Sequence, residues 1–393
     1  MSEPVFPMNV LVASALRTAV GRAGKGTLKN TRPDDMAGVV MQAALQQVKG
    51  LKAEQIEDVI LGCATPEAEQ GLNIARNAVF AAGWPDSIPG ETINRFCSSG
   101  LQAIAHVAQA IASGSMECAL AGGVECTSMV PMGGHVLSLN PRLVENYPEA
   151  YIGMGHTAER VARRFEVSRE DQDQFAVASQ NKAVAAIKAG RFKDEIVPLK
   201  ARSFRDGEVV HSDFDTDECP REGTTLEGLA KLRPVFAQKG SVTAGNASPM
   251  NDGAAAAILM SDKLAAELGV TGLGRMRAYA VVGVAPDIMG TGPIPAIRKI
   301  LADTGLSIED IDLFEINEAF AAQAVYCQRE LGIPDEKLNV NGGAIALGHP
   351  LGCTGAKLSA TLLHEMKRRE ARYGIVSMCI GGGMGAAGLF ERA

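Results

Sequence analysis

The sequence lacks the cysteine pairs that bind zinc or cross-link small secreted domains. Its eight cysteines, at positions 63, 97, 118, 126, 219, 327, 353 and 379, include no CxxC pair and follow no regular spacing. Structural zinc sites and disulfide frameworks both need such spacings. His349 and Cys353 are four positions apart, but no second pair of ligands accompanies them. We therefore expect no metal site, no disulfide framework and a reducing compartment.

The sequence also lacks an excess of basic charge and any apolar run of membrane-spanning length. Its formal net charge is −7, whereas nucleic acids and anionic membranes favour basic surfaces. The first stretch, MSEPVFPMNVLVAS, does not resemble a signal or transit peptide, and the last, FERA, is not a peroxisomal address. We expect a cytoplasmic protein that binds small molecules, with no nucleic-acid or membrane partner.

The chain is long and rich in glycine. Its 393 residues exceed one ordinary domain core, and 43 of them are glycine. Apolar residues make up 46% and charged residues 21%, which is typical of a folded α/β protein. Glycine is needed where backbone approaches a ligand closely, so this composition favours an enzyme with glycine-rich loops.

The chain repeats itself. The stretch GLKAEQIEDVILGCA, residues 50–64, aligns without gaps with GLSIEDIDLFEINEA, residues 305–319, and the two lie 255 positions apart. At the same offset Gly100 falls on Gly355, and each glycine opens a segment of helical periodicity. Helical patterns alternate with short β-rich runs, which indicates parallel βαβ units. We therefore predict two similar α/β halves packed together, although chance similarity of amphipathic segments is the alternative.

The first half carries an insertion. From Cys126 to about Ala247 the sequence is polar, broken by proline and glycine, and weakly periodic, apart from one strong helix pattern from Ser168 to about Ala189. Ser168 is the expected N-cap, with acidic residues in the first turn. We predict a loop-rich excursion, not a sheet, and domains at 1–273, with an inserted loop domain at about 126–247, and at 274–393. Long insertions of this kind are often binding loops.

Cys97 stands where a helix begins. Small residues follow it, and then apolar side chains at Leu101, Ile104 and Ala108 repeat with helical spacing. A helix N-terminus stabilises a thiolate, so the pattern predicts a lowered thiol pKa and a nucleophile. A buried structural cysteine is the other reading, because free cysteine is among the most buried residue types.

Three further clusters carry polar or glycine residues at expected turns. Asn317 and Glu318 follow the apolar run LFEI, where they could also form an ordinary helix cap. His349 lies between a glycine and a proline, a loop position that favours function. The segment SMCIGGGMGAAG has a G-x-G-x-x-G spacing, but the chain ends at Ala393, which leaves no room for the rest of a dinucleotide-binding unit. Two cysteines and a histidine at such turns suggest covalent catalysis with a separate acid and base.

These segments resemble, in order and spacing, the thiolase family. The motifs are INRFCSSGLQA, AGGVECTSM, VTAGNASPMNDGAAA, NEAFA, NVNGGAIALGHPLGCTGA and CIGGGMG, and the resemblance covers nearly the whole chain. It implies the thiolase fold: an α/β structure of two βαβαβ-type halves in a five-layered αβαβα sandwich, with a loop domain inserted in the first half. It also implies a homodimer or homotetramer and, in some members, a fatty-acid oxidation partner subunit.

The resemblance assigns a role to each catalytic candidate. Cys97 would be the nucleophile that becomes acylated, and His349 the base that activates it and later the thiol of coenzyme A. Cys379 would be the acid and base that exchanges the α-proton of the acetyl group. Asn317 would hold a water that stabilises the thioester oxygen together with His349, and the N–H groups of Cys97 and Gly381 would form a second oxyanion hole.

Coenzyme A would be a cosubstrate, with no permanently bound cofactor. The resemblance places its binding groups at Met154, Arg221 and Ser248, with Arg221 near the nucleotide and Ser248 near the pantetheine amides. The chain departs from short-chain members in having Gly153 where they have histidine, and Gly228 where serine is common. These departures affect expectations for substrate length, not for the chemistry.

The expected activity is CoA-dependent cleavage of 3-oxoacyl-CoA to acetyl-CoA and a shortened acyl-CoA, as in fatty-acid β-oxidation. An acetoacetyl-CoA thiolase that condenses two acetyl-CoA molecules is the alternative, and Gly153 argues modestly against it. A non-catalytic acyl-CoA or lipid carrier on the same scaffold is a remote alternative, because a carrier has no need to retain all the catalytic candidates.

Overall fold

The computed structural model describes residues 4–393, and a single extended sheet organises them. Its strands lie in the order β11-β12-β13-β10-β1-β9-β5-β3-β4, with the two-residue strands β2 (Gly21–Arg22) and β6 (Ile196–Val197) beside β9 and β1. The bounds of the main strands are β1 Val10–Thr18, β3 Val59–Gly62, β4 Glu91–Ile93, β5 Cys118–Cys126, β9 Asn251–Met260, β10 Gly274–Gly283, β11 Leu313–Ile316, β12 Tyr373–Ile380 and β13 Met384–Arg392.

The two halves of this sheet have the same topology. In the first half β1 and β5 each pair antiparallel with β9, and β3 pairs parallel with β5. In the second half β10 and β12 each pair antiparallel with β13, and β11 pairs parallel with β12. The halves meet where β1 pairs with β10 over three residue pairs. The predicted repeat of two similar α/β halves is therefore confirmed.

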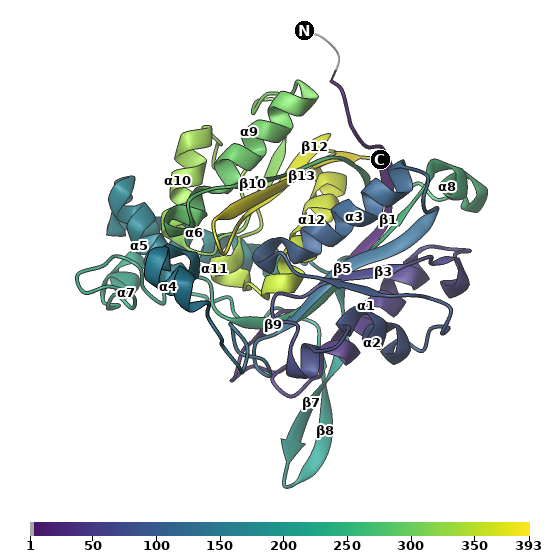
Figure 1. Cartoon of the computed structure of the whole chain (residues 1–393), viewed down its shortest axis with the longest axis horizontal. Helices are drawn as coiled ribbons and strands as arrows, with labels where there is room; N and C mark the ends of the chain where they lie inside the picture. The colour runs from purple at the N-terminus through teal and green to yellow at the C-terminus, as the bar shows by residue number, and fades with distance from the viewer. Residues whose placement is uncertain (1–3) are drawn as a thin grey trace.

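Helices form three layers around the two half-sheets (Figure 1). Helices α1 (Pro33–Gln47) and α2 (Ile74–Ala81) cover the outer face of the first half, and α9 (Pro293–Thr304) covers the outer face of the second, with α10 (Ala321–Leu331) beside it. Between the half-sheets lie α3 (Ser99–Ala112) and α12 (Leu351–Arg369). This is the five-layered α/β arrangement that the family resemblance implies.

The central helices cross at the two glycines that the repeat aligns. A Cβ atom added to Gly355 would lie 2.2 Å from the backbone nitrogen of Leu101, and one added to Gly100 would lie 2.6 Å from that of Ala356. No side chain fits at such distances, so glycine on both helices lets the backbones approach closely. The crossing brings the N-terminal ends of α3 and α12, one from each half, into the same region.

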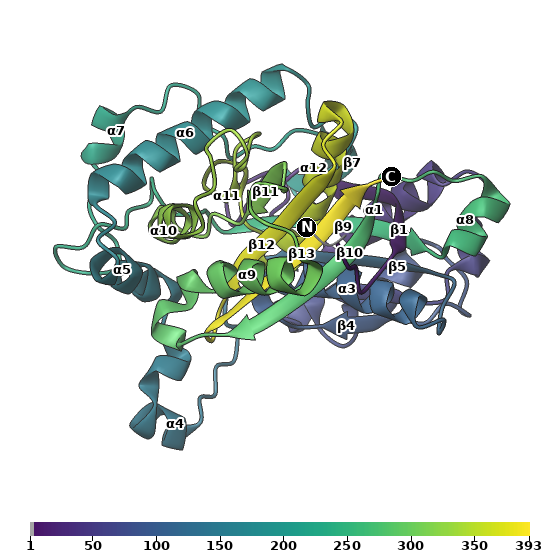
Figure 2. The same ribbon diagram turned by 90° about the horizontal axis from the view of Figure 1, so that it is seen from above.

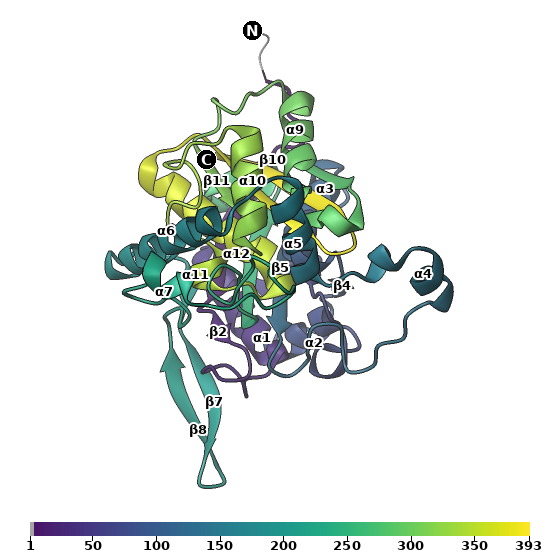
Figure 3. The same ribbon diagram turned by 90° about the vertical axis from the view of Figure 1, so that its left-hand side faces the viewer.

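The segment between β5 and β9 contains helices α4 (Pro141–Asn146), α5 (Met154–Arg164), α6 (Arg169–Lys188) and α7 (Leu226–Ala230). The predicted long helix is confirmed, since Ser168 caps α6 and Glu170 and Asp171 lie in its first turn. The prediction that this segment holds no sheet is wrong. Strands β7 (Leu199–Arg205) and β8 (Glu208–Phe214) form a hairpin that projects from the body (Figure 3).

The hairpin has a local cause. Its turn residues, Asp206 and Gly207, both have positive φ angles, of 54° and 85°, and Asp-Gly is a preferred pair for such a turn between antiparallel strands.

Seen from above, α6 runs alongside α10 and α11 (Ala344–Leu347) (Figure 2). The remaining helix, α8 (Asp262–Leu268), links β9 to β10. No helix within residues 4–393 is long and apolar enough to cross a bilayer.

Candidate active site

Asn317 lies directly after β11, in the turn that leads to α10. Its backbone N–H donates to the carbonyl of Ser377 on the neighbouring strand, at 2.9 Å, and its own carbonyl accepts from the Gln323 amide. Its side-chain nitrogen lies 3.3 Å from Nε2 of His349, while its side-chain oxygen is buried with no partner in the described chain. A buried amide oxygen without a partner is rare in a folded core, which suggests that this oxygen serves a ligand or a water.

His349 precedes α12 and is held by both ring nitrogens. Nδ1 lies 2.6 Å from the hydroxyl of Thr354, which itself donates to the carbonyl of Pro350 at 2.9 Å. Because the single hydroxyl proton is used on Pro350, the hydroxyl must accept from Nδ1–H, so Nε2 is unprotonated and accepts from the amide of Asn317. Burial lowers the pKa of His349 to about 3, so the ring is neutral and Nε2 is a free base.

The backbone around His349 is fixed by Asn251, the first residue of β9. The Asn251 side-chain oxygen accepts from the N–H of His349 at 2.8 Å, and its nitrogen donates to Gly21 and to Cys219. Gly348 has φ of +92°, and a Cβ there would lie 2.6 Å from the Asn251 side chain. Only glycine satisfies both the backbone angle and the close approach.

Cys97 lies in the short 3₁₀ turn Phe96–Ser98 that leads into α3. The N–H groups of Gly381 and of Cys97 itself point at its sulfur and lower its pKa, but burial has the larger effect and raises the pKa to about 11. The prediction of a thiol pKa below the usual value is therefore wrong for the free protein, although the N–H groups act in the expected direction. The physical reason is desolvation, which outweighs the helix N-terminus when a thiol is fully buried.

Cys379 lies near the end of β12, two residues before Gly381. Burial raises the pKa of Cys379 well above its usual value, and the nearby Cys97 adds to this effect. The thiol belongs to an apolar cluster that joins the second half to the inserted segment, formed by Met154, Ala158, Phe236, Val242, Ala247, Met289, Ala319 and Phe320. The structure thus buries two thiols, a neutral imidazole and an amide, with the two thiols near each other and the imidazole against the amide.

The residues predicted to contact coenzyme A fall into two groups. Arg221 lines a cavity of about 150 Å³, and the neighbours of Ser248 on both sides line it too. The Ser248 hydroxyl donates to the carbonyl of Ala319 at 3.1 Å, which ties this cavity to the turn after Asn317. Met154 does not line the cavity; it begins α5 and packs beside Cys379, with its sulfur 3.5 Å from the Cβ position of Gly381.

Sequence reasoning missed Thr354 and Asn251, which hold the side chain and the backbone of His349. Thr354 follows His349 by five residues in the first turn of α12, so a local signal existed, namely a hydroxyl one helical turn beyond the histidine. Asn251 is 98 positions away and on another strand. No local pattern predicts that contact.

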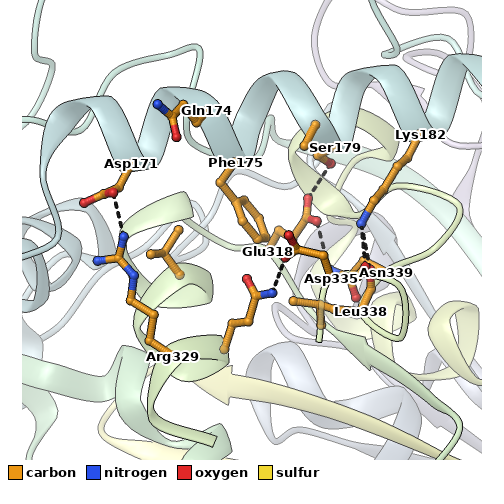
Figure 4. Close-up of a pocket in the computed structure, with 13 residues that line it drawn as sticks. Asp171, Gln174, Phe175, Ser179, Lys182, Glu318, Arg329, Asp335, Leu338 and Asn339 are labelled. Carbon is orange, nitrogen blue, oxygen red and sulfur yellow. Dashed lines mark hydrogen bonds and ion pairs between the residues drawn. The ribbon is translucent and has the colours of Figure 1, made fainter. Parts of the chain in front are cut away.

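A second cavity, of about 390 Å³, lies between α6 and α10 (Figure 4). Glu318 lines it together with Ser179, Lys182 and Asn339. The Glu318 carboxylate is buried, with 1% of its surface exposed, and its oxygens accept hydrogen bonds from Ser179 and Asn339 (Figure 4).

Comparison with known proteins gives a consistent result over the whole chain. The family models "Thiolase, N-terminal domain" and "Thiolase, C-terminal domain" match residues 10–263 and 270–392. The 3-ketoacyl-CoA thiolase of Bacillus subtilis (strain 168) is 53% identical over 386 residues, covering 97% of this chain and 98% of the relative. The peroxisomal 3-ketoacyl-CoA thiolase of Homo sapiens is 50% identical, covering 98% of this chain and 91% of the relative.

A solved structure is similar throughout. The acetyl-CoA acetyltransferase of Bacillus anthracis has a TM-score of 0.89 and 43% sequence identity, and the match covers 100% of both chains.

Proposed function

Because the chain belongs to the thiolase family, we propose that it cleaves 3-oxoacyl-CoA with free coenzyme A, as in fatty-acid β-oxidation. The products are acetyl-CoA and an acyl-CoA shortened by two carbons. The observation that carries this proposal is the neutral His349, whose unprotonated Nε2 lies 3.3 Å from the Asn317 amide, together with the buried and neighbouring thiols of Cys97 and Cys379.

The first half-reaction transfers the acyl group to Cys97. His349 takes the proton from the Cys97 thiol as its sulfur attacks the C3 carbonyl carbon of the substrate. The C2–C3 bond then breaks, the acyl group stays on Cys97 as a thioester, and the departing enolate of acetyl-CoA takes its proton from Cys379. The N–H groups of Cys97 and Gly381 supply donors where negative charge develops on one oxygen, and a water held by the free side-chain oxygen of Asn317 would supply a donor, with His349, at the thioester oxygen.

The second half-reaction releases the acyl group. The proton held by His349 restores the Cys379 thiol, so that both groups return to their starting forms. Coenzyme A then gives its thiol proton to His349 and attacks the thioester carbonyl, and the released Cys97 sulfur takes that proton back. Every proton is accounted for among these three side chains and the substrates, and coenzyme A enters as a cosubstrate rather than a resident cofactor.

Coenzyme A is proposed to bind along the cavity at Arg221 and Ser248. Arg221 supplies a cation for the phosphates of an anionic ligand on a chain whose net charge is −7. Met154 packs between this segment and Cys379, where it would contact the reacting end of the substrate. At Gly153 a Cβ would meet only the His156 ring, at 3.5 Å, and this open position supports substrates longer than acetoacetyl-CoA.

The assembly is proposed to be a homodimer or homotetramer. Strand β4 ends the sheet in the described chain and has one free edge, and Leu72 and Phe80 nearby are 98% and 50% exposed. A free edge with large apolar neighbours favours pairing with a second copy. Light scattering on the purified protein tests this.

The eight free thiols support a cytoplasmic location. A fatty-acid oxidation subunit is the proposed partner class.

The test is thiolysis of acetoacetyl-CoA and of 3-oxohexadecanoyl-CoA by the wild type and by Cys97→Ser. We expect wild-type activity that the variant abolishes, with preference for the long substrate. Activity confined to acetoacetyl-CoA would instead support the alternative named by the acetyl-CoA acetyltransferase relative. Absence of both activities in folded wild-type protein would contradict the proposed function.

A further inference from the structure

Glu318 is a buried carboxylate that joins three separate segments of the chain (Figure 4). One oxygen accepts from the Ser179 hydroxyl of α6 at 2.6 Å and from the N–H of Ile345 at 3.2 Å, and the other accepts from the Asn339 amide at 2.8 Å. No cation lies within ion-pair distance of it in the described chain. Its charged form is therefore stabilised mainly by these three donors, with a longer-range contribution from the Lys182 ammonium, which lines the same cavity.

The Asn339 amide extends this contact to both sides of the strand end. Its oxygen accepts from the N–H of Ile316 and its nitrogen donates to the Ile316 carbonyl, each at 2.9 Å. Asn339 itself has φ of +43°, a conformation that needs support from its surroundings. Both chain neighbours of Asn317 therefore bind Asn339. The backbone of Ile316 binds the Asn339 amide, and the carboxylate of Glu318 accepts from it.

The same carboxylate fixes the turn that leads to His349. A Cβ added to Gly343 would lie 2.1 Å from the Glu318 carboxyl carbon, so the turn passes directly against the carboxylate. The Gly343 N–H donates to the Ser179 hydroxyl at 3.1 Å, and the Ile345 N–H donates to Glu318 itself. The turns that carry Asn317 and His349 therefore share one anchor.

The next residue of α6 reaches the coenzyme A cavity. The Gln180 oxygen accepts from the backbone N–H of Arg221 at 2.8 Å, and its nitrogen donates to the carbonyl of Ile345 at 3.3 Å. Two consecutive residues of α6, Ser179 and Gln180, consequently contact both turns and the wall of the cavity. These contacts connect the inserted segment to the chemistry without any of these residues facing a thiol.

We propose that Glu318 is a positioning residue that, with Ser179 and Gln180, sets the geometry of Asn317 and His349 and couples it to the coenzyme A cavity. This proposal rests on the proposed thiolase function. Its physical basis is preorganisation: a shift of a fraction of an ångström in either turn misplaces Nε2 of His349 or the Asn317 amide relative to the reacting atoms.

The decisive variant is Glu318→Gln, which keeps size and shape. A glutamine offers one acceptor oxygen and one NH₂ group, so it must direct its NH₂ either at the Asn339 amide nitrogen or at the Ser179 and Ile345 donors. Either orientation opposes donor to donor and displaces one turn. We expect kcat to fall at least tenfold while KM for coenzyme A changes less than threefold. The double variant with Ser179→Ala should lose less than the product of the two single effects.

Gln180 provides the second arm of the test. Gln180→Leu removes the acceptor of the Arg221 N–H, so we expect KM for coenzyme A to rise at least threefold together with a fall in kcat.

The matched control for Glu318→Gln is Glu195→Gln. Glu195 is an equally buried carboxylate that accepts from Arg17 and Thr361 and touches neither turn. It is expected to lower the melting temperature while leaving kcat per folded enzyme unchanged.

The outcomes separate the two proposals. If the folded Glu318→Gln variant keeps wild-type kcat, or Glu195→Gln loses as much kcat at equal stability, Glu318 is structural only. If the wild type shows no thiolysis at all, the proposed function fails first. A crystal structure of Glu318→Gln then decides the positioning, since displacement of Asn317 or of His349 supports it and an unchanged arrangement of both overturns it.

Discussion

The hydroxyl of Thr354 determines which nitrogen of His349 can act as a base, and its removal gives a sharp prediction. In the structure this hydroxyl accepts from Nδ1–H at 2.6 Å and donates to the Pro350 carbonyl at 2.9 Å. Thr354→Val preserves the shape and volume of the side chain but leaves Nδ1–H without a partner inside a fully buried site. The alternative tautomer is no remedy, because its Nε2 already carries a proton and cannot take one from Cys97.

The magnitude follows from the cost of an unsatisfied buried donor, about 1–3 kcal/mol. At about 1.4 kcal/mol per tenfold change in rate, loss of this orientation should lower kcat/KM by about 5- to 140-fold. Thr354→Ser keeps the hydroxyl and should stay within about threefold of the wild type. The assay is spectrophotometric thiolysis combined with rapid-quench measurement of Cys97 acylation, and the acylation step should slow in proportion.

Thermal unfolding supplies the control for this prediction. Part of the same free energy is lost from stability, so the valine variant should melt a few degrees lower but remain folded at the assay temperature. A folded Thr354→Val enzyme with wild-type kcat/KM would refute the reasoning, because His349 would then need no partner at Nδ1.

Three further predictions address separate parts of the site and the fold. Burial raises the pKa of Cys97 to about 11, so its alkylation by iodoacetamide in the free protein should accelerate about 100-fold from pH 7 to pH 9; a plateau below pH 8 would indicate a preformed thiolate. Arg221→Ala should raise KM for coenzyme A about tenfold with little change in kcat, measured by steady-state kinetics, and an unchanged KM would place the nucleotide elsewhere. Gly355→Ala should lower the free energy of unfolding by about 1–3 kcal/mol in denaturant titrations, whereas Gly283→Ala, where a Cβ meets nothing within 4 Å, should change it by less than about 0.5 kcal/mol.

Local sequence was sufficient to predict the positions of the main candidates. Cys97, Asn317 and His349 were located from small, polar or glycine-rich residues at expected strand and helix boundaries, and each lies at such a boundary. The repeat predicted that Gly100 and Gly355 are equivalent, and the close crossing of α3 and α12 at these residues gives the physical reason. Patterns of this kind are readable because they depend on neighbours within a few positions.

The properties that depend on distant residues were not predictable. The thiol pKa of Cys97 was expected to fall, but its burial between the two halves raises it, and burial is a property of the assembled fold. Asn251 comes to His349 across 98 positions, and the Ser179 contact to Glu318 comes from α6, 139 positions away. The β7–β8 hairpin was missed for a different reason, since its Asp-Gly turn was present in the sequence but its strands are largely exposed and carry little apolar alternation.

Burial of both reacting groups has a consequence for how the proposed mechanism begins. A buried, protonated Cys97 reacts slowly with oxidants and alkylating agents, because the thiolate is the reactive form. Proton transfer becomes favourable only when a substrate carbonyl accepts the sulfur's electrons and places negative charge on an oxygen that faces N–H donors in a medium of low polarity. In this arrangement the substrate itself triggers formation of the nucleophile. Thr354, Asn251 and Glu318 hold the turns that carry His349 and Asn317. The positions of these two side chains then matter more to the rate than the resting pKa of the thiol.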